Sequence, residues 1–141
     1  MMKNKKINIA IVGFGNIGSY FYKTLQNNIK TIAIKTGKTP YVKYISARNL
    51  RKKRIIKIPL LKQFKDPLKL CLEKDIDIII ELIGGADGIA KKLVFSALKN
   101  KKHVITANKS LMAKYGMNLP LLLKKIKLIW NMKHLWQAES P

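Results

Sequence analysis

A glycine-rich hexapeptide placed directly after a short apolar run is the feature that most constrains the fold of this chain. Residues 7–12 read Ile-Asn-Ile-Ala-Ile-Val, which is typical of a strand buried on both faces of a parallel sheet. The apolar residues Ile17, Phe21 and Leu25 then recur at the spacing of an amphipathic helix. Between the two segments lies a G-x-G-x-x-G pattern made of Gly13, Phe14, Gly15, Asn16, Ile17 and Gly18.

A strand, a glycine-rich turn and a helix in this order predict a dinucleotide site. In such a turn Gly13 allows the chain to bend tightly, Gly15 lets the backbone approach a diphosphate, and Gly18 lets the helix pack closely on the strand. The free N–H groups and the partial positive charge at the helix N-terminus favour an anion. The alternative is a glycine-rich turn that binds no ligand.

The remainder of the chain alternates predicted strands with predicted helices. We expect further strands over residues 41–47, 75–83 and 103–107. We expect a short helix from Asp66-Pro67 to about residue 74 and helices over about 111–115 and 121–127. A further helix is expected over 87–101, capped by Asp87 and burying Ile89 on its apolar face. Residues 28–38 fit either an extension of the first helix or a loop. This alternation predicts an α/β fold, a Rossmann-like doubly wound parallel sheet, in one domain over residues 1–130.

The end of the second predicted strand bears on the choice of cofactor. The dinucleotide fingerprint expects an acidic residue there, which holds the ribose 2′-hydroxyl of NAD. This chain has Ala47-Arg48-Asn49 instead, with Arg51, Lys52, Lys53 and Arg54 behind it. A guanidinium at this place suits the 2′-phosphate of NADP, so Arg48 favours NADP over NAD. The alternative is a solvated basic loop in a Lys-rich protein.

Two further strand ends carry candidate binding residues. Ligands of open α/β sheets bind at the carboxyl ends of the strands. Gly84 follows Glu81-Leu82-Ile83, and Thr106, Asn108 and Lys109 follow the fourth predicted strand. Glycine there lets the backbone approach a ribose or nicotinamide, and Lys109 is within reach of a cofactor or an anionic substrate, unless it is one more surface lysine.

The composition raises a nucleic-acid hypothesis and also weakens it. With 29 Lys and Arg against 7 Asp and Glu, the formal net charge is +22, and such a field attracts anions. Only Arg48, Arg51 and Arg54 are arginines, and the abundance of Lys and Ile is typical of AT-rich codon usage. We therefore expect no specific nucleic-acid partner, although a basic nucleic-acid-binding module stays an alternative.

The remaining composition bounds the compartment and the metal chemistry. Cys71 is the single cysteine, which excludes a disulfide within the chain and favours the reducing cytoplasm. No Cys/His cluster has the spacing of a zinc site, so no metal is expected. No apolar run reaches the ~18 residues of a membrane span, so no membrane partner is expected.

Four segments in this order resemble homoserine dehydrogenase, the NAD(P)-dependent enzyme of the aspartate pathway. They are residues 11–18, residues 45–54 with Ser-Ala-Arg-Asn, residues 81–85 reading Glu-Leu-Ile-Gly-Gly, and residues 103–109 reading His-Val-Ile-Thr-Ala-Asn-Lys. The resemblance covers roughly residues 5–128. It implies that Phe14, Asn16 and Ile17 contact the dinucleotide, that Arg48 meets the NADP phosphate, and that Lys109 lies near the nicotinamide.

The resemblance also implies a reaction and its setting. The family transfers hydride reversibly between NAD(P)H and aspartate 4-semialdehyde to give homoserine, a step of threonine and methionine biosynthesis in the cytoplasm, and its full-length members are expected to be homo-oligomers. Its catalytic Lys and acidic residues lie in a substrate domain beyond the length of this chain, so we expect no catalytic residue here. The alternative enzyme is another amino-acid dehydrogenase with the same nucleotide domain.

The last eleven residues depart from the family pattern. Codons chosen for Asn131–Pro141 and read from the third base encode Tyr-Glu-Ala-Ser-Val-Ala-Gly-Gly-Ile-Pro, which is the kind of segment that the family has at this place. We therefore hypothesise a frameshift between about residues 128 and 131, so that residues 131–141 form an out-of-frame tail and the catalytic substrate domain is absent. Sequencing the DNA across this region tests the hypothesis, and an uninterrupted frame with other codons would end it.

Overall fold

Strand β1 (Lys5–Val12) is the strand around which the sheet is built. In the computed structural model, which describes residues 4–116, β1 pairs with β2 (Lys38–Ser46) on one side and with β3 (Ile78–Glu81) on the other. Strand β4 (His103–Thr106) pairs with β3. All these pairs are parallel, and the order within the described residues is β2-β1-β3-β4. The predicted parallel α/β sheet is confirmed.

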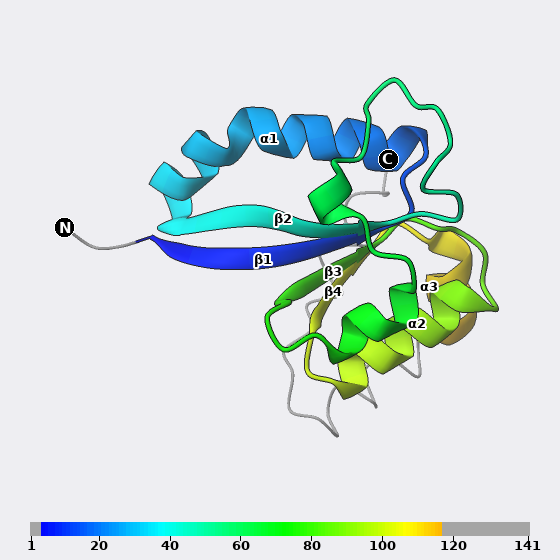
Figure 1. Cartoon of the computed structure of the whole chain (residues 1–141). Coiled ribbons are helices and arrows are strands. Elements are labelled where there is room, and N and C mark those ends of the chain that lie inside the picture. The colour runs from blue at the N-terminus through cyan, green and yellow to red at the C-terminus, as the bar shows by residue number, and fades with distance from the viewer. Residues whose placement is uncertain (1–3, 117–141) are drawn as a thin grey trace, which may run out of the picture.

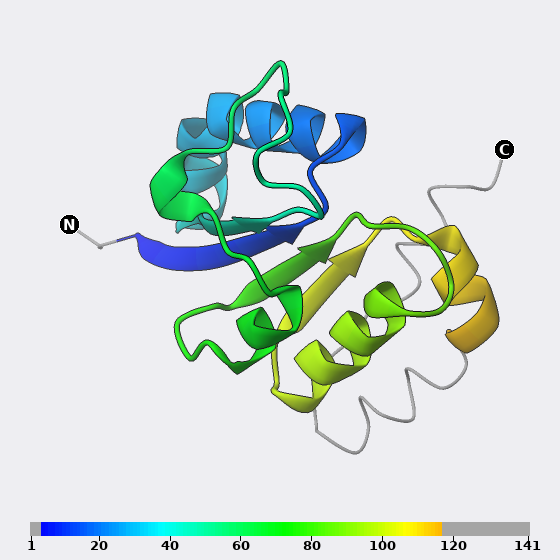
Figure 2. The same cartoon turned by 45° about the vertical axis from the view of Figure 1, so that its right-hand side comes forward.

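Helices cover both faces of this sheet. Helix α1 (Asn16–Thr36) lies over one face, whereas α2 (Ile89–Lys99) and α3 (Lys109–Tyr115) lie on the opposite side (Figure 1). The turned view shows the same separation, with the sheet between the two layers (Figure 2). Two short 3₁₀ helices, η1 (Leu60–Lys62) and η2 (Pro67–Leu72), lie in the connection between β2 and β3.

The side chains of β1 alternate between two cores, which explains why residues 9–12 are apolar at consecutive positions. Ala10 and Val12 pack in the core beside α2 and η2, while Ile9 and Ile11 pack in the core under α1. Strand β3 divides in the same way, with Ile79 in the first core and Ile80 in the second. Because both faces are covered, consecutive positions along the buried parts of these strands favour apolar residues.

The structure decides one element bound that the sequence left open and moves others. Helix α1 continues through residues 28–36 and ends at Gly37, whose φ of 69° provides a left-handed cap. Strand β2 begins at Lys38 and includes Pro40, which an edge strand tolerates because its outer side needs no ladder hydrogen bond. Strand β3 has four residues instead of the expected nine: it begins at Ile78, and it ends at Glu81 shortly before the turn at Gly84, where φ is 88°.

Helix α2 buries one apolar stripe, as its sequence predicts, with one exception. Ala90, Leu93, Val94, Ala97 and Leu98 are buried, but Ile89 is 46% exposed. The prediction that Ile89 joins the buried face was wrong, because it is the first residue of the helix and extends beyond the core. The helix predicted at residues 121–127 lies outside the described residues. None of the helices within residues 4–116 is long and apolar enough to cross a membrane.

Candidate dinucleotide site

The strand order creates one point at which a ligand crevice is expected. From β1 the chain moves outward to β2 and then returns to β3 on the other side of β1. The connections therefore leave the carboxyl ends of β1 and β3 in opposite directions, and in open parallel sheets this switch point is where ligands bind. The glycine-rich turn lies directly at the end of β1.

The three glycines of the turn meet three different surroundings. Gly13 has φ +100°, and a Cβ there would lie 2.6 Å from the carbonyl oxygen of Leu82. A Cβ on Gly18 would lie 2.4 Å from the carbonyl oxygen of Gly13. A Cβ on Gly15 would meet nothing within 4 Å, so this backbone faces open space at the start of α1. Gly13 and Gly18 are thus required by the packing of the protein itself, whereas Gly15 is not.

The other residues of the turn divide between core and surface. The Phe14 side chain is 3% exposed and meets the ring of Tyr22 edge-on, with ring centroids 5.8 Å apart. The Phe14 side chain is therefore not available to a ligand. Asn16 is exposed, and Ile17 is 65% exposed at the first turn of α1. Helix α1 begins at Asn16, its N-cap Gly15 provides no side-chain cap, and no acidic residue stands in its first turn.

The basic loop after β2 is fastened to this turn by Arg54, a contact that sequence reasoning missed. The Arg54 side chain donates Nε to the Phe14 carbonyl at 2.9 Å, Nη2 to the Asn49 carbonyl at 2.8 Å and Nη1 to the Lys52 carbonyl at 3.1 Å. Its position in the sequence places Arg54 among the cations that suit a 2′-phosphate, but its guanidinium is directed at backbone carbonyls. Arg48 is exposed just beyond the end of β2.

On the other side of the switch point, a buried carboxylate joins the ends of β3 and β4. Glu81 is fully buried, and its Oε1 accepts the N–H groups of Ile83 at 2.6 Å and Gly84 at 3.2 Å. Its Oε2 accepts the hydroxyl of Thr106 at 2.6 Å. Thr106 is itself buried and faces Glu81. The sequence does carry a signal for this contact, because Glu81 is a charged residue at the end of an apolar strand and a buried charge needs hydrogen-bond partners.

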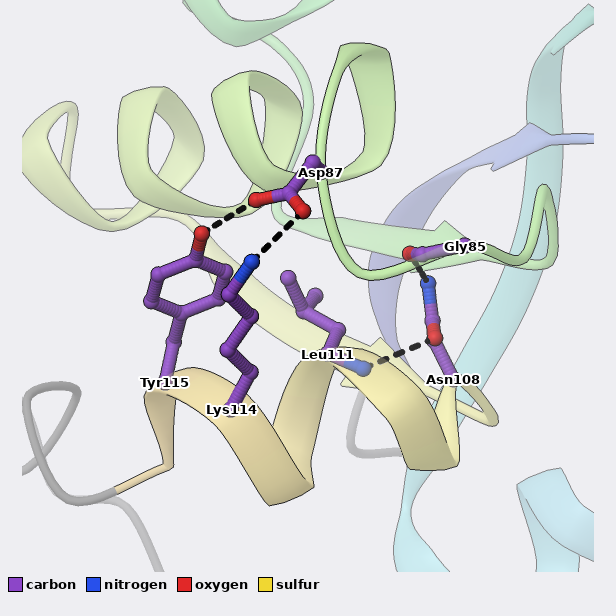
Figure 3. Close-up of polar contacts among 6 residues, drawn as sticks. All are labelled: Gly85, Asp87, Asn108, Leu111, Lys114 and Tyr115. Atoms are coloured by element: carbon purple, nitrogen blue, oxygen red, sulfur yellow. Dashed lines mark hydrogen bonds and ion pairs between the residues drawn. The ribbon is translucent and has the colours of Figure 1, made fainter.

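Asn108 connects the β3–α2 loop with α3. Its side chain accepts the Leu111 N–H at 3.0 Å, which caps α3, and donates to the Gly85 carbonyl at 2.5 Å (Figure 3). Its backbone N–H donates to the Thr106 hydroxyl oxygen at 3.0 Å. Lys109 is exposed and is the first residue of α3. The structure thus brings Gly84, Thr106, Asn108 and Lys109 to one side of the switch point, and the glycine-rich turn and Arg48 to the other.

Asp87 does not cap α2, contrary to the sequence-based expectation. Gly88 is the N-cap, and the Asp87 carboxylate instead turns toward α3, where Lys114 lies 2.7 Å away and the Tyr115 hydroxyl donates to it (Figure 3). The hydrogen bond from Lys114, and then that from Tyr115, lower the pKa of Asp87 below its usual 3.8. The same contact with Asp87 raises the pKa of Lys114 above 10.5.

Comparison with known proteins agrees with this geometry. A family model described as the NAD binding domain of homoserine dehydrogenase matches residues 13–127. The chain belongs to the homoserine dehydrogenase family. The homoserine dehydrogenase of Neisseria gonorrhoeae is 36% identical over 125 residues, which cover 89% of this chain and 28% of that protein. This chain therefore spans little more than a quarter of that relative.

Solved structures of homoserine dehydrogenases confirm the fold. The Staphylococcus aureus enzyme superimposes with a TM-score of 0.80 at 35% identity, covering 88% of this chain and 32% of that one. The Thiobacillus denitrificans enzyme gives a TM-score of 0.82 at 32% identity, covering 91% and 29%. The resemblance noted from the four sequence segments is confirmed, and the chain comprises the NAD(P)-binding domain of the homoserine dehydrogenase family.

Within residues 4–116 no group of three or more His, Cys, Asp or Glu side chains is arranged to hold a metal ion. In this homoserine dehydrogenase domain, three polar side chains bond backbone groups around the switch point, namely Arg54, Glu81 and Asn108. The site thus consists of shaped backbone, with charged side chains that fix the shape.

We predict that the contact of Asp87 with α3 stabilises the fold at neutral pH and not in acid. Because the pKa of Asp87 is lowered in the fold, its contribution is present above 3.8 and is lost as the pH falls through the lowered value. The raised pKa of Lys114 places the corresponding alkaline loss above 10.5. Both side chains are more than half exposed, so the effect is small and weakens with salt.

Urea unfolding of the native chain and of Asp87→Asn, measured from neutral to acid pH, checks this prediction. The difference in unfolding free energy between them should shrink as the carboxylate is protonated. Asp66→Asn is the matched control, because Asp66 caps η2 through a bond from the Leu68 N–H that an asparagine oxygen also accepts. A difference that stays constant into acid would contradict the ion-pair interpretation.

Proposed function

We propose that the chain binds NADP(H) or NAD(H) with the cofactor diphosphate at the glycine-rich turn and the N-terminus of α1. The observation that carries this proposal is the contrast among the three glycines. Gly13 and Gly18 are enclosed by protein, but the space beside Gly15 is open, although a Cβ would fit there without any clash. The absence of a side chain at Gly15 is explained if a ligand occupies that space.

The electrostatics of α1 support an anion at this place. The helix has 21 residues, so its first N–H groups carry the partial positive charge of a long helix. No side chain caps them, and no carboxylate stands in the first turn to compete with a phosphate. The proposed cofactor-binding residues are those of the sequence analysis, namely Gly13, Phe14 through its backbone, Gly15, Asn16, Ile17, Gly18, Arg48, Gly84, Thr106, Asn108 and Lys109.

We predict that Gly15→Ala weakens NADPH binding without destabilising the fold. The new methyl group occupies the space proposed for the diphosphate, and we expect a loss of affinity of tenfold or more, about 1.4 kcal/mol. Fluorescence titration of NADPH measures the affinity, and urea unfolding measures the stability. Gly18→Ala provides the contrast, since its methyl group would clash with the Gly13 carbonyl and cost about 1–3 kcal/mol of stability.

A wild-type chain that gives no saturable NADPH signal would overturn the proposed function. If wild type and Gly15→Ala bind NADPH with equal affinity, the diphosphate does not occupy the space beside Gly15, and the proposed placement is wrong. Both outcomes are separate from the stability measurement, which tests the packing alone.

We further propose that NADP is preferred over NAD, because the cation at the end of β2 stands where NAD-binding proteins place a carboxylate. Arg48 is exposed there, and Arg54 holds the backbone of the same loop against the turn at Phe14. The loop is thus a fixed part of the proposed site. Asn49 adds to its order, since its side-chain oxygen accepts the Arg51 N–H at 3.1 Å.

We predict that Arg48→Ala weakens NADPH binding and leaves NADH binding nearly unchanged. A lost hydrogen bond to a charged group is worth about 1.5–3 kcal/mol, roughly a tenfold to hundredfold loss. Arg51→Ala is the matched control, because it removes the same charge from an exposed position of the same loop. Equal effects of the two substitutions would instead indicate a solvated basic loop that acts only through its field.

We infer that the reaction served by this domain is the transfer of hydride between NAD(P)H and aspartate 4-semialdehyde to give homoserine. The proposal follows from membership of the family, as do cytoplasmic threonine and methionine biosynthesis and a homo-oligomeric full-length protein. Cys71 agrees with a reducing compartment, since it is free and buried, and burial raises the pKa of its thiol. We infer a small-molecule substrate, with no specific nucleic-acid or membrane partner.

We predict that the purified 141-residue chain oxidises homoserine with NADP⁺ little or not at all. Hydride transfer requires a substrate held in near-attack geometry, and the chain covers only 28% of the gonococcal homoserine dehydrogenase. A spectrophotometric assay of NADPH formation measures this, and readily measurable turnover would contradict it.

The division into a nucleotide domain over residues 1–130 and an out-of-frame tail over 131–141 stays a prediction, and the tail lies outside the described residues.

A further inference from the structure

Glu81 is a buried carboxylate with no part in the function proposed above. Its side chain is fully buried at the end of β3, yet it lies at the edge of the sheet where the cofactor is proposed to bind. Burying a carboxylate is costly unless several donors satisfy it, and Glu81 has three: two backbone N–H groups and the Thr106 hydroxyl. So complete a set of partners indicates that Glu81 holds the surrounding backbone in one shape.

The backbone held by Glu81 belongs to the loop between β3 and α2. The N–H groups of Ile83 and Gly84 point to the carboxylate, so the carbonyl of Ile83, which shares a trans peptide with the Gly84 N–H, is directed away from it. Thr106 and Asn108 close the arrangement, because Thr106 accepts from the Asn108 N–H and Asn108 donates to the Gly85 carbonyl. One carboxylate thereby links the ends of two neighbouring strands.

The outer side of this loop is open. Gly84 and Gly85 have φ of 88° and 81°, and a Cβ on Gly84 would meet nothing within 4 Å. The nearest atom to a Cβ on Gly85 would be the Asp87 carbonyl oxygen at 4.0 Å, and Ile83 is 42% exposed. The loop therefore presents its backbone, with one carbonyl turned outward, at the switch point.

The position of the loop relative to the glycine-rich turn assigns it to one half of the cofactor. A dinucleotide bound at a switch point spans it, with the adenine ribose at the end of the strand that carries the specificity residue. That strand is β2, on one side of β1, while β3 and β4 lie on the other side. The half that extends over β3 and β4 is then the nicotinamide half.

We propose that Glu81 is a positioning residue for the nicotinamide half of the cofactor, acting through the Ile83–Gly85 backbone that it fixes. The inference rests on the proposed function, since it requires NAD(P)(H) to bind at this switch point. Glu81 itself touches no ligand. It keeps the outward carbonyl of Ile83 and the open glycine backbone in the arrangement that meets the nicotinamide ribose or its carboxamide.

The test compares a whole cofactor with its adenine half. NADPH and adenosine 2′,5′-bisphosphate, which lacks the nicotinamide half, are titrated calorimetrically into the 141-residue chain and its variants. In Glu81→Leu three donors lose their acceptor, so NADPH affinity should fall about tenfold or more while that of the bisphosphate stays within roughly twofold. Glu81→Gln should restore much of the NADPH affinity, because an amide oxygen accepts the same two N–H groups.

Glu73→Leu is the matched control, because it makes the same chemical change at the end of η2, away from the switch point. It should alter neither affinity. Equal weakening of both ligands in Glu81→Leu would show a general structural role and overturn the proposal, as would NADPH binding that does not change. If Glu81→Leu does not fold, Glu81→Asp decides by the same comparison, since the shorter side chain moves the carboxylate away from its three donors. A wild-type chain that binds neither ligand would refute the proposed function, and this result is distinct from the two outcomes that overturn the role of Glu81.

Discussion

Contact of backbone with backbone at the β1–α1 turn is the constraint on which the rest of the structure depends. The carbonyl of Leu82 lies against Gly13, and the carbonyl of Gly13 lies against Gly18. Three segments therefore meet with no side chain between them: the end of β1, the first turn of α1 and the chain that leaves β3. A side chain at Gly18 would push α1 away from the turn and move the N–H groups that the proposed diphosphate site requires, and a side chain at Gly13 would push away the chain that leaves β3.

The sequence predicts the elements whose pattern is set by the burial of whole faces. The run at residues 7–12 is recognisable because β1 is covered on both sides, and α2 is recognisable because one stripe packs on the sheet. The bounds are harder to predict where tertiary position decides them. Residues 28–36 continue α1 until the left-handed Gly37 ends it, and Pro40 lies inside a strand only because that strand is at the edge.

The candidate site divides in the same way. The spacing of glycines predicts the turn, because each glycine answers a local demand for a bend or a close approach. The distant partners of Arg54, Glu81 and Asp87 could not be predicted, because the fold brings them from segments far away in the sequence. Asp87 is an example. Its position just before α2 suits a helix cap, but α3 brings the Lys114 ammonium and the Tyr115 hydroxyl within hydrogen-bonding distance. The sequence around Asp87 does not reveal these partners.

Two side chains of opposite charge, Arg54 and Glu81, orient the peptide groups of the candidate site. Arg54 attracts the carbonyl of Phe14, and in a trans peptide this turns the N–H of Gly15 the other way, away from the guanidinium. Glu81 attracts the N–H of Gly84 and thereby turns the carbonyl of Ile83 away from the carboxylate. Arg54 thus leaves the Gly15 N–H as a hydrogen-bond donor beside the glycine-rich turn, where the phosphates of the proposed cofactor would need donors. Glu81 leaves the Ile83 carbonyl as an acceptor at the end of β3, where the hydroxyl and amide groups of the cofactor would need acceptors. The proposed NAD(P)(H) has the first requirement at its central diphosphate and the second at its nicotinamide half. A cation and an anion on opposite sides of the same switch point would therefore serve both without touching the ligand.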